Sequence, residues 1–180
     1  MTLKDNDIEG ATAGTDFGIG IRLIYGTEVL YGFTSSESEE ELLKLTANLA
    51  ATRKANKKSS IPVNFQHEKT TNIHNIAINP ADVLSQTKVD ILRKSNDIAR
   101  KISPLIKQVT INISDSDKKI IIANSEGLFI EDSQIRSRYV ISVTAEDGGE
   151  MFTASDTPGA LKGFEFFENL DITLHVKKAA

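Results

Sequence analysis

The pattern of apolar and polar residues predicts a β-hairpin near the start of the chain. Between residues 17 and 25 every second side chain is apolar, which places Phe17, Ile19, Ile21 and Leu23 on one face. Residues 25–28 read as a turn, and residues 29–34 read as the returning strand.

The pattern then changes to the helical period in two stretches. The first helix can be capped by Ser36 or Ser38, with Glu39 or Glu41 completing a capping box, and its buried stripe is Leu42, Leu45 and Leu49. The second begins near Asn79-Pro80, carries Leu84, Ile91 and Ile98 at heptad spacing, and ends at Ser103-Pro104. Residues 56–79 lack either period and read as a long connection.

Alternation returns in the last part of the chain. We predict a strand over residues 109–113, a turn at 115–118, a returning strand over 119–123 and a second turn at 124–127. A strand follows over residues 128–132, and alternation returns at Tyr139, Ile141, Val143 and Ala145. Residues 146–149, Glu-Asp-Gly-Gly, are a hairpin signal before a final strand over residues 151–155. This order predicts an α+β fold with largely antiparallel sheets and two main amphipathic helices between two strand-rich halves.

Composition narrows the class of protein. The chain has 180 residues, a net charge of -4 and no cysteine, so thiolate metal sites and cysteine nucleophiles are excluded. The acidic balance does not favour a general nucleic-acid surface, and no apolar run approaches the ~20 residues of a membrane span. The polar N-terminus does not resemble a signal peptide, so the expected compartment is the cytoplasm.

The histidines supply the first candidate chemistry. His67-Glu68 followed by His74 suggests a zinc protease, in which two histidines on one helical face bind the metal beside a glutamate base. The second histidine comes too late for that motif and the segment lacks helical period, which favours a polar loop. His175 carries no motif.

Four other sets of residues are weighed in the same way. Gly14, Gly18 and Gly20 lead into a strand, unlike a phosphate loop, and Ser125 lies between two strands rather than on a nucleophile elbow. Asp115 and Asp117 lack the further ligands of a calcium loop and read as a hairpin tip. The last set is a basic cluster that reads as the end of the first helix: Arg53, Lys54, Lys57 and Lys58. From the residues alone we therefore assign no catalytic, cofactor-binding or metal-binding residue.

Several strings together resemble the TldD/PmbA family, whose members are also known as modulators of DNA gyrase. They are residues 8–10, 14–22, 31–35, 122–128, 145–149 and 163–168, in the family's order. The similarity covers nearly the whole chain.

The resemblance implies a zinc metallopeptidase that acts on peptides or unfolded proteins and assembles as a homo- or heterodimer. The family's zinc motif, His-Glu-x-x-x-His, belongs to its C-terminal half, and His67-Glu68 does not match it. We therefore expect residues 1–180 to be a single N-terminal-type domain, truncated at both ends and inactive alone, without nucleic-acid or membrane partners. Its expected role is to help form the substrate cleft and the dimer.

Two further expectations follow from the resemblance. Four apolar side chains are expected to be exposed where the second half of the family would follow: Leu161, Phe164, Phe166 and Phe167. The alternative to the peptidase hypothesis is a free-standing binding or assembly module, and a weaker alternative is an independent metal hydrolase built on His67, Glu68 and His74.

Overall fold

The computed structural model describes residues 1–53, 62–69 and 73–180. These residues form helices and mostly antiparallel strands, which confirms the α+β prediction. The chain separates into two compact units, one of residues 13–62 and the other of residues 1–12 with 63–180.

The unit of residues 13–62 is a hairpin packed against one helix. Strands β3 (Ile19–Tyr25) and β4 (Glu28–Thr34) pair antiparallel, as predicted, and the helix is α1 (Glu39–Ala51). The stripe Leu42, Leu45 and Leu49 is half-buried. A Cβ on Gly32 would lie 2.9 Å from Leu45 Cδ1, so this glycine lets the helix approach the sheet. Ser38 is the N-cap residue, but its side chain makes no capping hydrogen bond.

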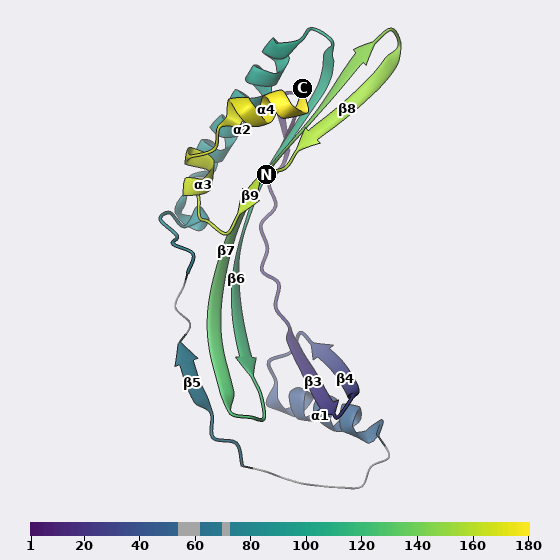
Figure 1. Cartoon of the computed structure of the whole chain (residues 1–180), viewed down its shortest axis with the longest axis vertical. Helices are drawn as coiled ribbons and strands as arrows, with labels where there is room; N and C mark the ends of the chain where they lie inside the picture. Colours follow the sequence, from purple (N-terminus) through teal and green to yellow (C-terminus); the bar gives the residue numbers. More distant parts are fainter. Residues whose placement is uncertain (54–61, 70–72) are drawn as a thin grey trace. The chain divides into compact units, whose positions relative to one another are not determined.

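The larger unit is built on a seven-stranded sheet. Its central pair is β6 (Ile106–Ala123) and β7 (Leu128–Asp147), a long antiparallel hairpin (Figure 1). On the β6 side lie β1 (Thr2–Lys4) and then β2 (Asp7–Gly10). On the β7 side lie the antiparallel β8 (Glu150–Asp156) and β9 (Gly159–Ala160) and the parallel β5 (Gln66–Lys69).

Helices cover one face of this hairpin at the end where β6 begins and β7 ends. They are α2 (Ser85–Ile102), which packs on β6, the short α3 (Glu165–Glu168), and α4 (Ile172–Ala179), which packs on β7 and β8 (Figure 1). A 3-10 turn, Pro80–Asp82, precedes α2. The core is formed mainly by buried side chains of α2, β6, β7 and α4, among them Leu92, Ala99, Val109, Ile111, Tyr139, Ile141 and Val176.

Three sequence predictions on local structure are wrong. Residues 115–118 are not a turn, because β6 continues through them in register with β7. Leu84 is not part of the buried stripe of the second helix; it is the N-cap residue of α2 and is 76% exposed. The connection of residues 56–79 contains a strand, β5, although residues 54–61 and 70–72 lie outside the described part.

The aromatic residues near the C-terminus also differ from the expectation. Phe164 and Phe167 are each 2% exposed, and their ring centroids lie 5.3 Å apart within the core. Phe166 is partly buried against the same cluster. These side chains therefore stabilise their own unit, and they do not form an exposed surface.

The turn predictions at the ends of β7 are confirmed. Gly127 has φ +98, and Gly148 and Gly149 have φ +60 and +87. These values lie in the left-handed region, which glycine adopts without steric cost. Among the described residues, none of the helices is both long and apolar enough to cross a membrane.

Candidate functional site

One stretch of the outer edge of β7 has no strand partner among the described residues. On this side β5 pairs with residues 128–131, β9 with residues 137–138 and β8 with residues 141–147. Residues 132–136 lie between these partners, while their other side remains paired with β6 (Figure 1). We call residues 132–136 the β7 edge.

Hydrogen bonds on both sides of the β7 edge show which backbone groups point outward. Tyr139 donates its N–H to Pro158 O at 2.9 Å, and Gln66 donates to Gly127 O at 2.7 Å. Tyr139 is an odd-numbered residue of β7, and Gly127 is the turn residue just before the strand begins. Because the N–H and C=O of successive strand residues alternate in direction, the backbone groups of Ser133 and Ile135 also point outward.

A groove adjoins this edge. It has a volume of about 500 Å³ and is lined by Ser114, Asp115, Ser116, Arg136, Ser137, Arg138, Gly159, Ala160 and Leu161. Arg136 and Arg138 are exposed and lie on one face of β7, whereas Ser137 points to the buried face. A Cβ on Gly159 would lie 3.5 Å from Arg138 Cγ and 3.2 Å from Ser137 O, so a glycine here leaves room for the arginine stem.

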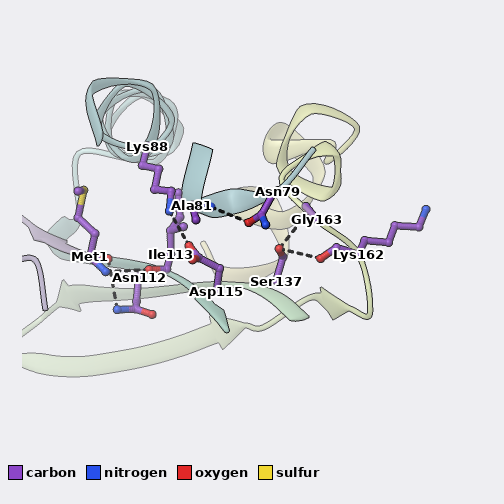
Figure 2. A network of polar contacts seen from close by, with 10 residues as sticks. All are labelled: Met1, Asn79, Ala81, Lys88, Asn112, Ile113, Asp115, Ser137, Lys162 and Gly163. Atoms are coloured by element: carbon purple, nitrogen blue, oxygen red, sulfur yellow. Dashed lines mark hydrogen bonds and ion pairs between the residues drawn. The ribbon is translucent and has the colours of Figure 1, made fainter. Parts of the chain in front are cut away.

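A set of polar contacts fixes the wall of the groove. Ser137 is buried and its hydroxyl lies 3.0 Å from the carbonyl oxygens of both Lys162 and Gly163 (Figure 2). The Glu165 carboxylate accepts hydrogen bonds from Gly163 N at 2.8 Å and from Ile78 N at 3.0 Å. These contacts tie the segment after β9 to β7 and to the segment before α2.

The ionisation of Glu165 follows from these contacts. Burial works to raise the pKa of Glu165, but the backbone N–H groups of Ile78, Gly163 and Ala77 stabilise the carboxylate, and the net effect is a lowered pKa. Glu165 is therefore ionised at neutral pH and acts as a structural acceptor.

The structure does not bring the predicted zinc residues together. His67 lies on β5, 3.8 Å from Glu131 Oε2 through Nε2 and 5.0 Å from the Phe129 ring between centroids. Glu68, its neighbour on the strand, is exposed. Within the described residues, no group of three or more His, Asp or Glu side chains could hold a metal ion. His67, Glu68 and His74 therefore do not fit a zinc site, and the zinc that the family resemblance implies belongs to the C-terminal half of that family.

His175 has a structural contact that the sequence did not indicate. Its Nδ1 lies 2.8 Å from Asp156 Oδ2, which links α4 to the end of β8. The hydrogen bond from His175 lowers the pKa of Asp156, and Lys178 Nζ, 4.0 Å away, adds to the effect. The pair holds the helix on the sheet.

Among the predicted glycine positions, Gly20 is approached by a side chain. A Cβ there would lie 2.9 Å from the Tyr31 hydroxyl. Among the described residues, a Cβ on Gly18 has only Thr34 O within 4 Å, at 3.7 Å, and a Cβ on Gly14 has no atom within 4 Å. These positions do not form a phosphate loop, because the segment leads into β3.

The remaining candidates also have structural roles. Ser125 lies in the turn between β6 and β7, where Asn124 Oδ1 accepts hydrogen bonds from two backbone N–H groups. Asp115 Oδ2 lies 2.6 Å from Lys88 Nζ (Figure 2), and Asp117 accepts a hydrogen bond from Ser133.

The basic cluster is described only in part. Arg53 Nε lies 3.2 Å from Glu28 Oε2, and its guanidinium lies 4.3 Å from the Tyr25 ring centroid. Arg53 therefore joins the end of α1 to the β3–β4 turn. Lys54, Lys57 and Lys58 lie outside the described residues.

The β7 edge was missed because the sequence only shows that residues 128–147 favour strand. The available signal was the alternation of Gln134, Arg136 and Arg138 on one face, opposite the apolar residues Ile135, Tyr139 and Ile141. Which stretch of β7 lacks a partner among the described residues depends on where β5 and β9 pair with it.

Two family models match the chain. Residues 1–52 match "PmbA/TldA metallopeptidase domain 1", and residues 78–180 match "PmbA/TldA metallopeptidase central domain". Among curated proteins, the metalloprotease TldD homolog of Buchnera aphidicola (subsp. Acyrthosiphon pisum) is 25% identical over 179 residues, covering 94% of this chain and 35% of its own length. A metalloprotease of Methanocaldococcus jannaschii is 28% identical over 188 residues, covering 100% of this chain and 41% of its own length. The chain thus spans well under half the length of these relatives.

Solved structures agree on the fold. A candidate modulator of DNA gyrase from Bacteroides thetaiotaomicron superposes with a TM-score of 0.72 at 16% identity, over 99% of this chain and 41% of that one. TldE from Thermococcus kodakarensis superposes with a TM-score of 0.65 at 16% identity, over 99% of this chain and 40% of that one. At this identity the likeness establishes the fold alone.

Proposed function

Because the chain belongs to the PmbA/TldD family of metallopeptidases, we propose that it is a non-catalytic portion of a TldD/PmbA-like zinc metallopeptidase acting on peptides or unfolded proteins. Its relatives are named metalloproteases. The proposed role of this chain is to bind an extended polypeptide and to help form the substrate cleft and the dimer. The cytoplasm stays its predicted compartment.

The observation that carries this proposal is the β7 edge. The outward N–H and C=O groups of Ser133 and Ile135 have no strand partner among the described residues and can pair with an added strand. Main-chain pairing of this kind binds peptides with little dependence on sequence. That property suits a peptidase of unfolded polypeptides. The groove beside the edge leaves room for side chains of the added strand.

A proline substitution tests the edge with little disturbance of the fold. Ile135→Pro removes one outward N–H, whereas the ladder with β6 uses the even-numbered residues next to it. Proline is tolerated where the missing N–H faces away from the sheet. Ile135→Val, which keeps the N–H, is the matched control. Far-UV circular dichroism and a thermal melt establish that both variants fold.

The probe is a fluorescein-labelled peptide of serine, threonine and valine residues, titrated with the 180-residue chain and followed by anisotropy. We expect the unsubstituted chain and Ile135→Val to bind it and Ile135→Pro to bind at least about tenfold more weakly. Amide hydrogen exchange at Ser133 and Ile135 is expected to slow when the peptide is added. Equal binding by a folded Ile135→Pro variant overturns the proposed role of the edge.

Domain organisation and assembly are tested separately. The prediction that residues 1–180 form a single domain is supported if calorimetry and circular dichroism report one coincident unfolding transition, and is contradicted by two transitions. Sedimentation with and without a TldE-type or second TldD-type subunit tests the dimer. A His-Glu-x-x-x-His segment downstream of this chain, in its own frame or a neighbouring one, would separate the peptidase from the free-standing binding module.

A further inference from the structure

Arg136, the last residue of the β7 edge, and Arg138, which pairs with Gly159 of β9, are two cations on one face of β7. Among the described residues, neither Arg136 nor Arg138 forms an ion pair, and the side-chain hydrogen bond that Arg136 donates to Gln134 Oε1 is long, at 3.5 Å. The acidic side chains nearby are already engaged. Asp115 binds Lys88 at 2.6 Å, and Asp132 accepts a hydrogen bond from Gln134 at 3.0 Å.

Two serine hydroxyl groups, which are neutral hydrogen-bond donors, lie on the same face as the two arginines. In the β6–β7 register, Ser116 is opposite Arg136 and Ser114 is opposite Arg138. Residues opposite one another share a face, so two guanidinium groups and two hydroxyl groups line the same side of the hairpin. All four residues line the groove. The site thus presents hydrogen-bond donors and positive charge, both of which suit carboxylates.

The spacing of these donors points to an extended ligand. Residues two apart on a strand are about 7 Å apart, because each residue adds about 3.3 Å. An extended peptide places its own alternate side chains at the same interval. A peptide residue opposite Arg136 would lie on the arginine face, with Arg138 as its diagonal neighbour, and the peptide residue opposite Gln134 would be the diagonal neighbour of Arg136.

We propose that Arg136 and Arg138 select extended polypeptides that carry Asp or Glu at alternate positions. This inference rests on the proposed peptide binding at the β7 edge and adds a charge preference to it. Exposed ion pairs contribute modestly, so the preference is a bias among peptides and adds to the main-chain pairing. It weakens with added salt, because the groups are solvent-exposed.

The test compares three labelled peptides of equal length on the 180-residue chain. One alternates glutamate and threonine, the second has the same composition with its glutamates in one block, and the third alternates lysine and threonine. The arginine variant is Arg136→Gln with Arg138→Gln. The control is Arg93→Gln with Lys94→Gln, which makes the same change of charge at exposed positions of α2.

We expect the alternating glutamate peptide to bind more tightly than the other two at low salt. The arginine variant is expected to lose about two- to thirtyfold in affinity for that peptide, the product of two exposed ion pairs. The α2 control is expected to retain the affinity. Equal binding of the glutamate and lysine peptides, or an equal loss in the α2 control, overturns the inference.

Ile135→Pro separates this inference from the proposed function. If Ile135→Pro abolishes binding of every peptide while charge pattern has no effect, the strand edge stands and the arginine preference is refuted. If the arginine-dependent preference persists unchanged in Ile135→Pro, acidic recognition stands and pairing at the edge is refuted.

Discussion

Replacing Gly163 by alanine should destabilise the larger unit strongly, although it adds one methyl group. A Cβ at this position would lie 2.0 Å from Ile78 O, 2.6 Å from Glu165 Oε2 and 2.9 Å from Ile76 Cγ2. The first of these atoms belongs to the backbone, so it cannot move away by changing rotamer. The segments around Ile78 and Gly163 must separate.

The cost follows from the hydrogen bonds that cross this contact. Phe164 donates its N–H to Ile78 O at 2.8 Å, and the Glu165 carboxylate accepts from Ile78 N and Gly163 N. A neutral bond contributes about 1 kcal/mol and a bond to a charged group about 1.5–3 kcal/mol. Loss of the neutral bond and one charged bond therefore costs about 3 kcal/mol. For a chain of this length that lowers the melting midpoint by roughly 6–12 °C.

The assay is thermal and urea unfolding of the 180-residue chain, followed by circular dichroism at neutral pH. Gly10→Ala is the matched control, because Gly10 belongs to the same unit and, within the part of the chain that the structure describes, no atom lies within 4 Å of a Cβ at this position. We expect that control to change the free energy of unfolding by less than about 0.5 kcal/mol.

A second readout isolates the Glu165 contacts. Because the pKa of Glu165 is lowered, its contribution to stability is present above the ordinary value of 4.5 and is lost as pH falls through the lowered pKa. Gly163→Ala is expected to remove this part of the acid dependence together with the stability at neutral pH. If Gly163→Ala melts within 1 °C of Gly10→Ala at about pH 7, the contact does not constrain the fold and the reasoning is wrong.

Three other outcomes are expected. The 180-residue chain should bind no stoichiometric zinc and cleave no peptide, and tight zinc at one equivalent that is lost in His67→Ala would contradict this. The lowered pKa of Asp156 means that its bond to His175 stabilises the fold above the ordinary value of 3.8 and is lost as pH falls through the lowered pKa. Asp156→Asn should therefore reduce the loss of stability towards urea as pH falls below 3.8, and an unchanged profile would refute the link. Replacing Gly148 and Gly149 together by valine should cost about 1–3 kcal/mol, because both have positive φ, and an unchanged melting midpoint would contradict that.

The sequence pattern was sufficient to predict elements whose structure is determined by residues close together in the sequence. The hairpin of β3 and β4, the half-buried stripe of α1, and the glycine turns at 127 and 148–149 follow from alternation, helical period and positive φ respectively. The family resemblance rested on the same short strings, and the family models match the chain over residues 1–52 and 78–180.

The sequence pattern was insufficient where a segment distant in sequence determines the local structure or the burial of a side chain. Asp115 and its neighbours favour a turn by themselves, but cross-strand pairing with residues 134–137 keeps them extended, and Lys88 of α2 binds the carboxylate. Phe164 and Phe167 were expected at the surface because their covering elements were not evident. The tertiary structure buries them in the same core cluster as side chains of α2 and of the sheet.

The candidate site is also determined by segments distant in sequence. From the sequence, Ile135 and Arg136 are ordinary residues of a strand with alternating apolar and polar side chains. Only the tertiary structure pairs β5 with residues 128–131 and β9 with residues 137–138 along the same side of β7. Strand pairing joins segments far apart in the chain, so tertiary packing determines which backbone groups of β7 have no strand partner among the described residues. The alternation that aligns Arg136 with Arg138 was determined by the sequence alone.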